Sequence, residues 1–349
     1  MSKTRKVVMR SDAGRVSTEE QETPEPKPGQ LLIEVHASMV SPGTELGGMK
    51  RRRENPGDPT QKRPFGYTNA GIVIGKEGDC DEFEIGDRVA GMGGGYALHA
   101  TYACVPHNLC AKIPENVKYE AAASVHLTAT ALHAVQRGRI RIGENVVIAG
   151  LGMLGQLASQ VAKTAGAYVI GLDKLPLRLK IAEKSGIGRA INVSETDPIP
   201  ISQEFTKGYG MDCGIIAFGG DATSAFQQIR SMLKLAPDTH RMGRIVIVGG
   251  ASITHGFAAG LGNVDVISAA RTGPGYHDED YEHGADYPPV LVPWPTQRNL
   301  ELSLRLISEG KVNLDHIITD IVPIDQASEA CEKLIQTPDE ALGVIFTMK

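Results

Sequence analysis

The sequence has little cysteine, few aromatic residues and no strong charge of either sign. Its 349 residues contain 5 cysteines, which are scattered and form no Cys-x-x-Cys pair. That pattern argues against a disulfide framework and a four-cysteine zinc site, and it favours a cytoplasmic location, where thiols stay reduced. The formal net charge of −5 is too mild to suggest nucleic acid or an acidic membrane surface as a partner.

Long apolar runs are also missing from the chain. No stretch approaches the ~20 apolar residues of a membrane span, so no membrane partner is expected. The length instead suggests one very large domain or two ordinary ones. The composition is that of a globular protein with many glycines.

A glycine-rich turn between two apolar runs is the most informative feature of the sequence. The turn Gly150-x-Gly152-x-x-Gly155 follows a short apolar run and opens a run at helical spacing. Gly150 permits the tight turn, Gly152 lets the backbone approach a pyrophosphate, and Gly155 lets the helix pack on its strand. Free N–H groups at the start of the helix favour a diphosphate. The alternative is an α/β crossover whose glycines serve packing alone.

An acid at the end of the second apolar run indicates which dinucleotide binds. Asp173 lies at the offset of about 20 residues where a carboxylate accepts hydrogen bonds from a ribose hydroxyl, and it would repel a 2′-phosphate. NAD is therefore favoured over NADP, although Lys174 and Arg178 leave some tolerance of NADP open. The residues predicted to bind the cofactor are Gly150, Gly152, Met153, Leu154, Gly155, Asp173 and Lys174.

The pattern of apolar residues changes along the chain and divides it into two parts. From about Lys6 to Pro114, short apolar runs are separated by Gly- and Pro-rich turns, which predicts a β-barrel-like unit. Residues Tyr119 to Arg137 have helical spacing, and strand and helix signals then alternate as far as Val264–Ala269. This alternation predicts a parallel sheet with helices on both faces. The tail, Ile317 to Met348, is expected to return to the first domain.

The arrangement resembles the zinc-type alcohol dehydrogenase-like enzymes of the medium-chain dehydrogenase/reductase superfamily. The markers in this chain are Gly86-Asp87-Arg88-Val89, Ala121-Ala122-Ala123, Gly150 to Gly155, Asp173 and Gly310-Lys311. The resemblance implies an α/β fold with a GroES-like β-barrel catalytic domain and a Rossmann doubly wound parallel-sheet domain. The expected boundaries are 1–121 and 296–349 for the catalytic domain, and 122–295 for the Rossmann domain. A homodimer or homotetramer is also implied, with Val264–Ala269 as an edge strand that could pair between subunits.

Zinc-dependent members of this superfamily carry three metal ligands, and the matching positions differ here. The cysteine of the first position is replaced by Pro42, or by Ser41 if the alignment slips by one residue. The histidine of the second position is Tyr67, and only His126, at the third, is a good zinc ligand. Because catalytic zinc usually takes three protein ligands, no zinc is expected. In this respect the chain resembles a branch of the superfamily that lacks the zinc ligands. That branch is similar to bacteriochlorophyllide-type and sugar dehydrogenase-like members.

Without zinc, side chains must polarise a carbonyl group and move a proton. Thr44 matches the hydroxyl residue that begins the proton relay of zinc-dependent members, and Tyr67 and His126 match ligand positions. A phenol and an imidazole can serve as acid and base. Glu45 could be a buried ion-pair partner or a base. The simpler alternatives are that Tyr67 fills the space of the metal, His126 is a hydrogen-bonded helix residue and Thr44 caps local backbone.

The least generic stretch of the chain runs from Arg271 to Pro288. A long irregular loop in a compact domain is often functional. Its Tyr, His and Asp residues suit hydroxyl-rich ligands, because they exchange hydrogen bonds while aromatic faces cover apolar sugar edges. The alternative is an arm at a subunit interface. Substrate contacts are predicted for Ser41, Tyr276, His277 and Tyr281, whereas His99 and His133 are expected to be structural or exposed.

Together these patterns predict an NAD(H)-dependent, zinc-independent oxidoreductase. It would interconvert a secondary alcohol and a ketone on a hydroxyl-rich small molecule such as a sugar, cyclitol or polyol derivative. One alternative is an NADPH-dependent enone or quinone reductase, although such enzymes usually carry a basic residue where Asp173 stands. Another is a non-catalytic, dinucleotide-sensing binding protein, which would function without Tyr67 or His126.

Overall fold

The computed structural model describes residues 4–348, and this part of the chain forms two units, each with its own core. Unit 1 comprises the residues up to Ala129, then Thr272–Gly310 and the residues from Ile318 onward, whereas unit 2 comprises Thr130–Arg271 and Lys311–Ile317. The division differs from the expected domain boundaries chiefly at residues 272–295, which belong to unit 1. The long loop of the sequence analysis is therefore part of the β-rich unit.

Unit 2 is built on a parallel sheet with the strand order of a dinucleotide-binding fold. Its six main strands are β9 (Asn145–Ala149), β10 (Tyr168–Asp173), β11 (Arg189–Asn192), β12 (Cys213–Ile216), β15 (Arg241–Val248) and β17 (Asn263–Ala269). They pair in parallel in the order β11-β10-β9-β12-β15-β17, and the short β14 (Lys234–Leu235) joins β15 antiparallel. The order reverses between β9 and β12, the position where such folds bind dinucleotides.

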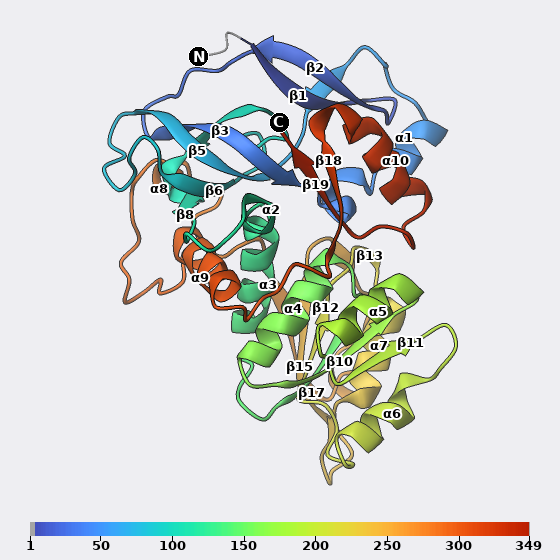
Figure 1. Ribbon diagram of the computed structural model, residues 1–349. Helices are drawn as coiled ribbons and strands as arrows, with labels where there is room; N and C mark the ends of the chain where they lie inside the picture. Colours follow the sequence, from blue (N-terminus) through green and yellow to red (C-terminus); the bar gives the residue numbers. More distant parts are fainter. Residues whose placement is uncertain (1–3, 349) are drawn as a thin grey trace. The chain divides into compact units, whose positions relative to one another are not determined.

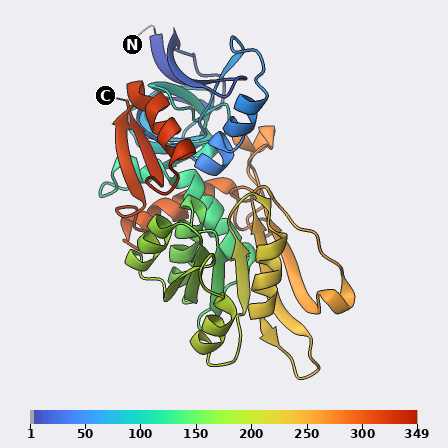
Figure 2. The same cartoon turned by 90° about the vertical axis from the view of Figure 1, so that its right-hand side faces the viewer.

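Helices cover both faces of this sheet (Figures 1 and 2). They are α4 (Met153–Thr164), α5 (Pro176–Lys184), α6 (Pro198–Phe205) and α7 (Thr223–Met232). In α4, Leu157, Ala158, Val161 and Ala162 are buried, which is the apolar stripe expected of a helix packed on a sheet. A small parallel pair, β13 (Gly220–Asp221) with β16 (Ala251–Ser252), and the turn η3 (Ala258–Gly260) complete the unit.

Unit 1 contains two sheets whose strands pair mostly antiparallel. The larger sheet has the order β18-β19-β3-β5-β6-β8, with β7 also paired to β3, and the smaller has the order β2-β1-β4. The strands are β1 (Thr4–Ser11), β2 (Val16–Glu22), β3 (Gln30–Met39), β4 (Lys62–Pro64), β5 (Thr68–Glu77), β6 (Arg88–Met92), β7 (Tyr102–Pro106), β8 (Cys110–Lys112), β18 (Ile318–Pro323) and β19 (Gly343–Thr347). As predicted, the tail returns to the β-rich unit, because β19 pairs with β3.

Short helices and turns connect these strands. They are η1 (Pro42–Leu46), α1 (Met49–Glu54), η2 (His107–Leu109), α2 (Tyr119–Ala122), α3 (Val125–Arg137), α8 (Glu279–Glu282), α9 (Thr296–Ser308), η4 (Ile324–Gln326) and α10 (Ala327–Gln336). The core of this unit packs α10 against β19 and β1, with Leu334, Phe346 and Val8 all buried. These elements hold η1 and the start of β5, which carry most of the residues predicted to handle protons.

The single helix predicted from Tyr119 to Arg137 is in fact two. The helix α2 ends at Ala122 and α3 begins at Val125. Ser124 lies between them, and both its N–H (3.1 Å) and its hydroxyl (2.7 Å) donate to the carbonyl oxygen of Ala121. A serine that bonds nearby backbone in this way competes with the helical ladder, so the periodic pattern concealed a break.

Candidate active site

The glycine-rich turn joins β9 to α4 and fits a dinucleotide. Gly150 has a φ of 88°, in the left-handed region, and a Cβ on Gly155 would lie 1.8 Å from the carbonyl oxygen of Gly150. Both positions therefore require glycine. At Gly152, φ is −65° and the nearest atom to an added Cβ is 3.9 Å away, on Arg178, so the backbone is open to an approaching ligand. The helix α4 has no side-chain cap, which leaves its first N–H groups for an anion.

Asp173, at the end of β10, is buried against the same turn. One carboxylate oxygen accepts from the Leu151 N–H at 2.7 Å, and the other accepts from the N–H groups of Lys174 and Leu175 at 2.7 and 3.0 Å. Arg178 Nη1 lies 3.6 Å from Asp173. The carboxylate thus holds the turn in shape. Each of its oxygens has two lone pairs, so a contact to a ribose hydroxyl stays a prediction that the geometry allows.

Most of the residues predicted to handle protons meet in unit 1. The Tyr67 and His126 rings lie 4.4 Å apart between centroids, and the Tyr276 ring lies edge-on to His126 at 5.8 Å. The turn η1 brings Ser41 and Thr44 to hydrogen-bond with the phenol of Tyr67. We call Ser41, Thr44, Tyr67, His126 and Tyr276 the Tyr67 cluster. Four segments that are separate in the sequence therefore form one polar and aromatic group.

Tyr67 keeps its proton in this environment. Burial raises the pKa of its phenol well above the usual value of 10.0, and the carboxylate of Glu45 raises it further. Hydrogen bonds from Ser41 and Thr44 partly oppose these two effects. At neutral pH the phenol is therefore a hydrogen-bond donor and a proton donor, which is the state that a carbonyl oxygen needs as it becomes a hydroxyl.

His126 is neutral at physiological pH. Burial lowers its pKa to about 4, a hydrogen bond with the carbonyl of Tyr67 partly opposes this, and His277 lowers the pKa further. Its Nδ1 lies 3.2 Å from the main-chain oxygen of Tyr67, so Nδ1 carries the hydrogen. Burial therefore keeps the imidazole uncharged, and its role as an acid–base residue stays a prediction. A neutral imidazole with its hydrogen on Nδ1 can accept a hydrogen bond from a substrate hydroxyl at Nε2.

Glu45 is buried beneath the Tyr67 cluster and is already bonded. Its Oε1 lies 3.1 Å from His99 Nε2, and its Oε2 accepts from the Ser41 N–H at 2.6 Å. The other ring nitrogen of His99 lies 2.8 Å from Ser38 Oγ. His99 was expected only to be structural or exposed, and Ser38 was not singled out. Neither residue has a local sequence signal, because His99 is identified only by its contact with Glu45, and Ser38 only by its contact with His99.

The predicted substrate contacts separate into two sets. Tyr276 is partly exposed, accepts a hydrogen bond from the Gly94 N–H at 2.6 Å and stacks on the exposed His277 at 3.9 Å. Tyr281 is instead 2 % exposed, and its hydroxyl accepts from the Gln297 N–H at 3.1 Å. The structure thus places Tyr276 and His277 beside His126, and Tyr281 in the core under the same loop.

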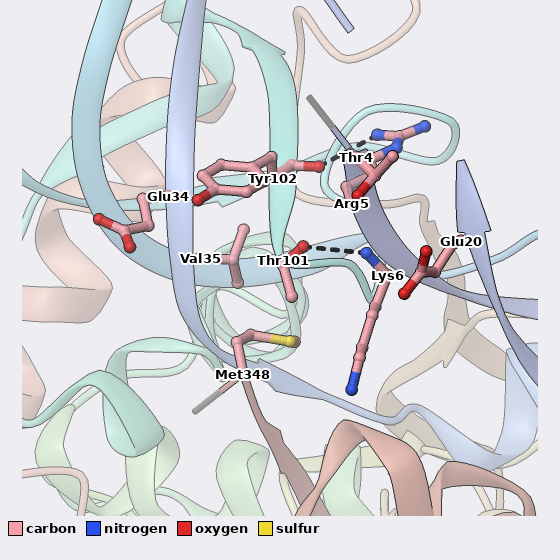
Figure 3. A pocket seen from close by; sticks show the side chains of 9 residues that line it. All are labelled: Thr4, Arg5, Lys6, Glu20, Glu34, Val35, Thr101, Tyr102 and Met348. Atoms are coloured by element: carbon pink, nitrogen blue, oxygen red, sulfur yellow. Dashed lines mark hydrogen bonds between the residues drawn. The ribbon is translucent and has the colours of Figure 1, made fainter. Parts of the chain in front are cut away.

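A second polar hollow of unit 1 lies between β1, β3 and β7 (Figure 3). Its cations are already engaged, since Arg5 donates to the carbonyl oxygen of Tyr102 at 3.0 Å and Lys6 pairs with Asp325 at 2.7 Å. None of the residues of the Tyr67 cluster lines it. The hollow therefore offers no convergent group for chemistry.

Within residues 4–348, no group of three or more His, Cys, Asp or Glu side chains is placed to hold a metal ion. In the same part of the chain, no helix has the length and apolar character needed to cross a bilayer.

Comparisons with known proteins find relatives among the dehydrogenases. A family model described as zinc-binding dehydrogenase matches residues 154–277. The chain is 24 % identical over 368 aligned residues to the D-arabitol-phosphate dehydrogenase of Enterococcus avium, covering 96 % of each protein. It is 25 % identical over 327 aligned residues to the sorbitol dehydrogenase of Bacillus subtilis, covering 83 % of this chain and 82 % of the relative.

A solved structure shows the same fold. It is an Escherichia coli oxidoreductase/dehydrogenase of unknown specificity involved in membrane biogenesis, with a TM-score of 0.80, 21 % identity and coverage of 99 % of both chains. The fold is the expected combination of a GroES-like and a Rossmann domain. The matches identify an oxidoreductase that acts on CH–OH groups. The chain belongs to the zinc-type alcohol dehydrogenase-like members of the medium-chain dehydrogenase/reductase superfamily.

Proposed function

We propose that this enzyme is an NAD(H)-dependent, zinc-independent oxidoreductase that interconverts a secondary alcohol and a ketone. Its substrate is a hydroxyl-rich small molecule such as a sugar, cyclitol or polyol derivative. One observation carries the proposal: the buried phenol of Tyr67, bonded to Ser41 and Thr44, lies against the ring of His126, with 4.4 Å between the ring centroids. By the family resemblance, Tyr67 and His126 match two ligand positions of zinc-dependent members.

The Tyr67 cluster supplies the acid–base part of the reaction. When bound at the turn of Gly150 to Gly155, NADH supplies a hydride equivalent. Tyr67 donates its proton to the carbonyl oxygen, so that the new hydroxyl forms without a free alkoxide. The exposed hydroxyl of Thr44 returns a proton to Tyr67 from solvent. His126, whose Nδ1 donates to the Tyr67 carbonyl, orients the alcohol form of the substrate by accepting a hydrogen bond from a substrate hydroxyl at Nε2.

The substrate class follows from the residues beside the phenol. The stacked rings of Tyr276 and His277 present an aromatic face that can cover the apolar edge of a sugar ring. The relatives that act on D-arabitol phosphate and sorbitol support a polyol-like substrate. Ser41 and Thr44 add hydroxyl groups that can both donate and accept.

Asp173 supports NAD over NADP, because a carboxylate disfavours a 2′-phosphate. Arg178 lies close enough to soften this preference. We also propose that the enzyme is a cytoplasmic homo-oligomer. Within the described residues β17 pairs only with β15, so its other edge is a suitable surface for pairing two subunits.

The test measures activity with each cofactor and substrate together with the zinc content of the protein. Purified protein is incubated with NAD or NADP and a panel of polyols, cyclitols, sugars and simple alcohols, while absorbance of the reduced nicotinamide is followed and zinc is quantified. We expect turnover of polyols with NAD, a zinc content far below one per chain and no inhibition by a chelator. Stoichiometric zinc whose removal abolishes activity would overturn the zinc-independent mechanism. Reduction of enones with NADPH alone would favour the reductase alternative.

A further inference from the structure

We propose that His99 is a positioning residue for the proton transfer, acting through Glu45 on the hydroxyl groups that bind Tyr67. The proposal rests on the proposed function, because that function gives Tyr67 the role of proton donor. It adds a buried layer, formed by Ser38, His99 and Glu45, to the Tyr67 cluster.

The buried layer is a continuous chain of hydrogen bonds. Ser38 Oγ, His99 and the carboxylate of Glu45 follow one another at 2.8 and 3.1 Å, and the Ser41 N–H closes the chain at 2.6 Å. Ser38 and His99 are fully buried, and Glu45 is 4 % exposed. A carboxylate so far from water is costly unless its oxygens are bonded, and here each oxygen has a partner.

The imidazole of His99 is fixed in one orientation. The rings of Phe65 and Phe346 meet it edge-on at 5.3 and 5.1 Å. A Cβ on Gly66 would lie 2.2 Å from the main-chain nitrogen of His99, so the segment that leads into Tyr67 packs closely against the His99 backbone. Rotation of the ring would break both of its hydrogen bonds, and the surrounding packing offers no replacement.

The hydrogen bonds also assign the protons. An ionised Glu45 can only accept, so Nε2 of His99 carries a hydrogen, and Nδ1 accepts from the hydroxyl of Ser38 when the ring is neutral. The Glu45 carboxylate contributes to the raised pKa of Tyr67, after the larger effect of burial.

Glu45 also closes the turn that carries the hydroxyl groups. Its carboxylate accepts from the Ser41 N–H, and its own N–H donates to the Ser41 carbonyl at 2.9 Å. This reciprocal pair resembles a capping box and holds Ser41 and Thr44 on one side of the turn. Loss of His99 would free the carboxylate and loosen the two hydroxyl groups that bind Tyr67. The predicted substrate face of Tyr276 and His277 would be unchanged, so the loss would affect kcat rather than KM.

A double-mutant cycle tests the proposal. The variants His99→Gln and Tyr67→Phe and their combination are assayed on the best substrate of the panel, with NAD titration and thermal unfolding as checks of folding. We expect Tyr67→Phe to lower kcat by roughly 10²- to 10⁴-fold, the range for general acid catalysis. His99→Gln should lower kcat by about 10- to 100-fold with little change in KM, and it should add nothing to the double variant, since coupled residues are non-additive.

Two further variants keep the result interpretable. Ser38→Ala removes only the far end of the chain, so it should give a smaller loss of kcat with the same non-additivity if His99→Gln does not fold. His133→Gln, in a partly buried histidine of α3 outside the Tyr67 cluster, should leave kcat unchanged.

The outcomes distinguish failure of the His99 positioning role from failure of the proposed function. Losses that multiply in the double variant, or an unchanged kcat in His99→Gln, would overturn the positioning role of His99. An unchanged kcat in Tyr67→Phe would overturn the proposed function itself. Loss of kcat in His133→Gln equal to that in His99→Gln would show that the effect is general destabilisation, which also overturns the proposal.

Discussion

His126 Nδ1 lies 3.2 Å from the carbonyl oxygen of Tyr67, and the same two residues bring their rings to 4.4 Å between centroids. The imidazole is thus held by the backbone of the residue that it faces. Because this contact is made in a site closed to water, the pKa of His126 falls to about 4. A histidine of that kind makes the stability of the protein depend on pH.

We predict that unit 1 loses stability below pH 6.5. The unfolded chain binds a proton at His126 near pH 6.5, whereas the folded chain does not until about pH 4. The stability that neutral His126 contributes to the folded state is fully present above pH 6.5. Protonation of His126 in the unfolded chain removes about 2 kcal/mol of that stability by pH 5. Urea unfolding at pH 7.5 and pH 5.0, followed by fluorescence of the single tryptophan in unit 1, measures the loss. The variant His126→Gln should lack this share of the pH dependence, and an equal loss in both proteins would contradict the assignment.

Substitutions at two glycines of the turn should affect stability and cofactor binding separately. An added Cβ at Gly155 meets the Gly150 carbonyl at 1.8 Å, so Gly155→Ala should destabilise unit 2 by about 1–3 kcal/mol. At Gly152 the backbone is ordinary and the space is open, so Gly152→Ala should keep its thermal stability. It should nevertheless weaken NAD binding at least about 10-fold, because the methyl group stands where a pyrophosphate approaches. Unaltered NAD affinity in Gly152→Ala would place the cofactor elsewhere.

Asp173 should control the choice of cofactor. We expect Asp173→Asn to raise the Kd for NAD and lower the Kd for NADP, so that their ratio changes by roughly 10-fold or more as the repulsion disappears. A stability loss of about 1–3 kcal/mol should accompany this change, because the carboxylate serves three backbone N–H groups. Fluorescence titration with both cofactors measures it. Asp197→Asn, which alters the carboxylate that caps α6, is the matched control and should leave both Kd values unchanged.

The Tyr276 hydroxyl should matter for substrate binding. It accepts a hydrogen bond from Gly94 at 2.6 Å and so fixes the loop beside His126. Tyr276→Phe should raise KM about 3- to 10-fold, as expected for loss of roughly 1 kcal/mol of hydrogen bonding, with a smaller change in kcat. Tyr287→Phe removes another hydroxyl of the same loop, one bonded to Asp278, and is the matched control. If both variants behave alike, the loop acts as a whole and Tyr276 has no separate role.

Much of the fold could be predicted because its signals are local. The parallel sheet of unit 2 follows from alternating strand and helix patterns, and the glycine turn lies within one β–α–β segment of contiguous residues. Of two predictions that failed, one failed for a local reason and the other because of long-range contacts. The break at Ser124 was concealed because its side chain competes for a carbonyl without disturbing the apolar spacing. Residues 272–295 were assigned to the Rossmann domain because they follow its last strand, whereas their contacts, such as Asn108 to Tyr281, belong to unit 1.

The sequence by itself determined the glycine turn, the acid after β10 and the replacement of metal ligands by Tyr67, since each depends on residue type and on short spacing. Only the tertiary structure decided how Glu45 is used, because its partner His99 is 54 residues away and reaches it through the pairing and packing of separate strands. The tertiary structure also set the pKa of His126, which depends on burial, and it divided Tyr276 at the site from Tyr281 in the core. Burial and long-range contact arise from how the strands pack, and no single stretch of sequence encodes them.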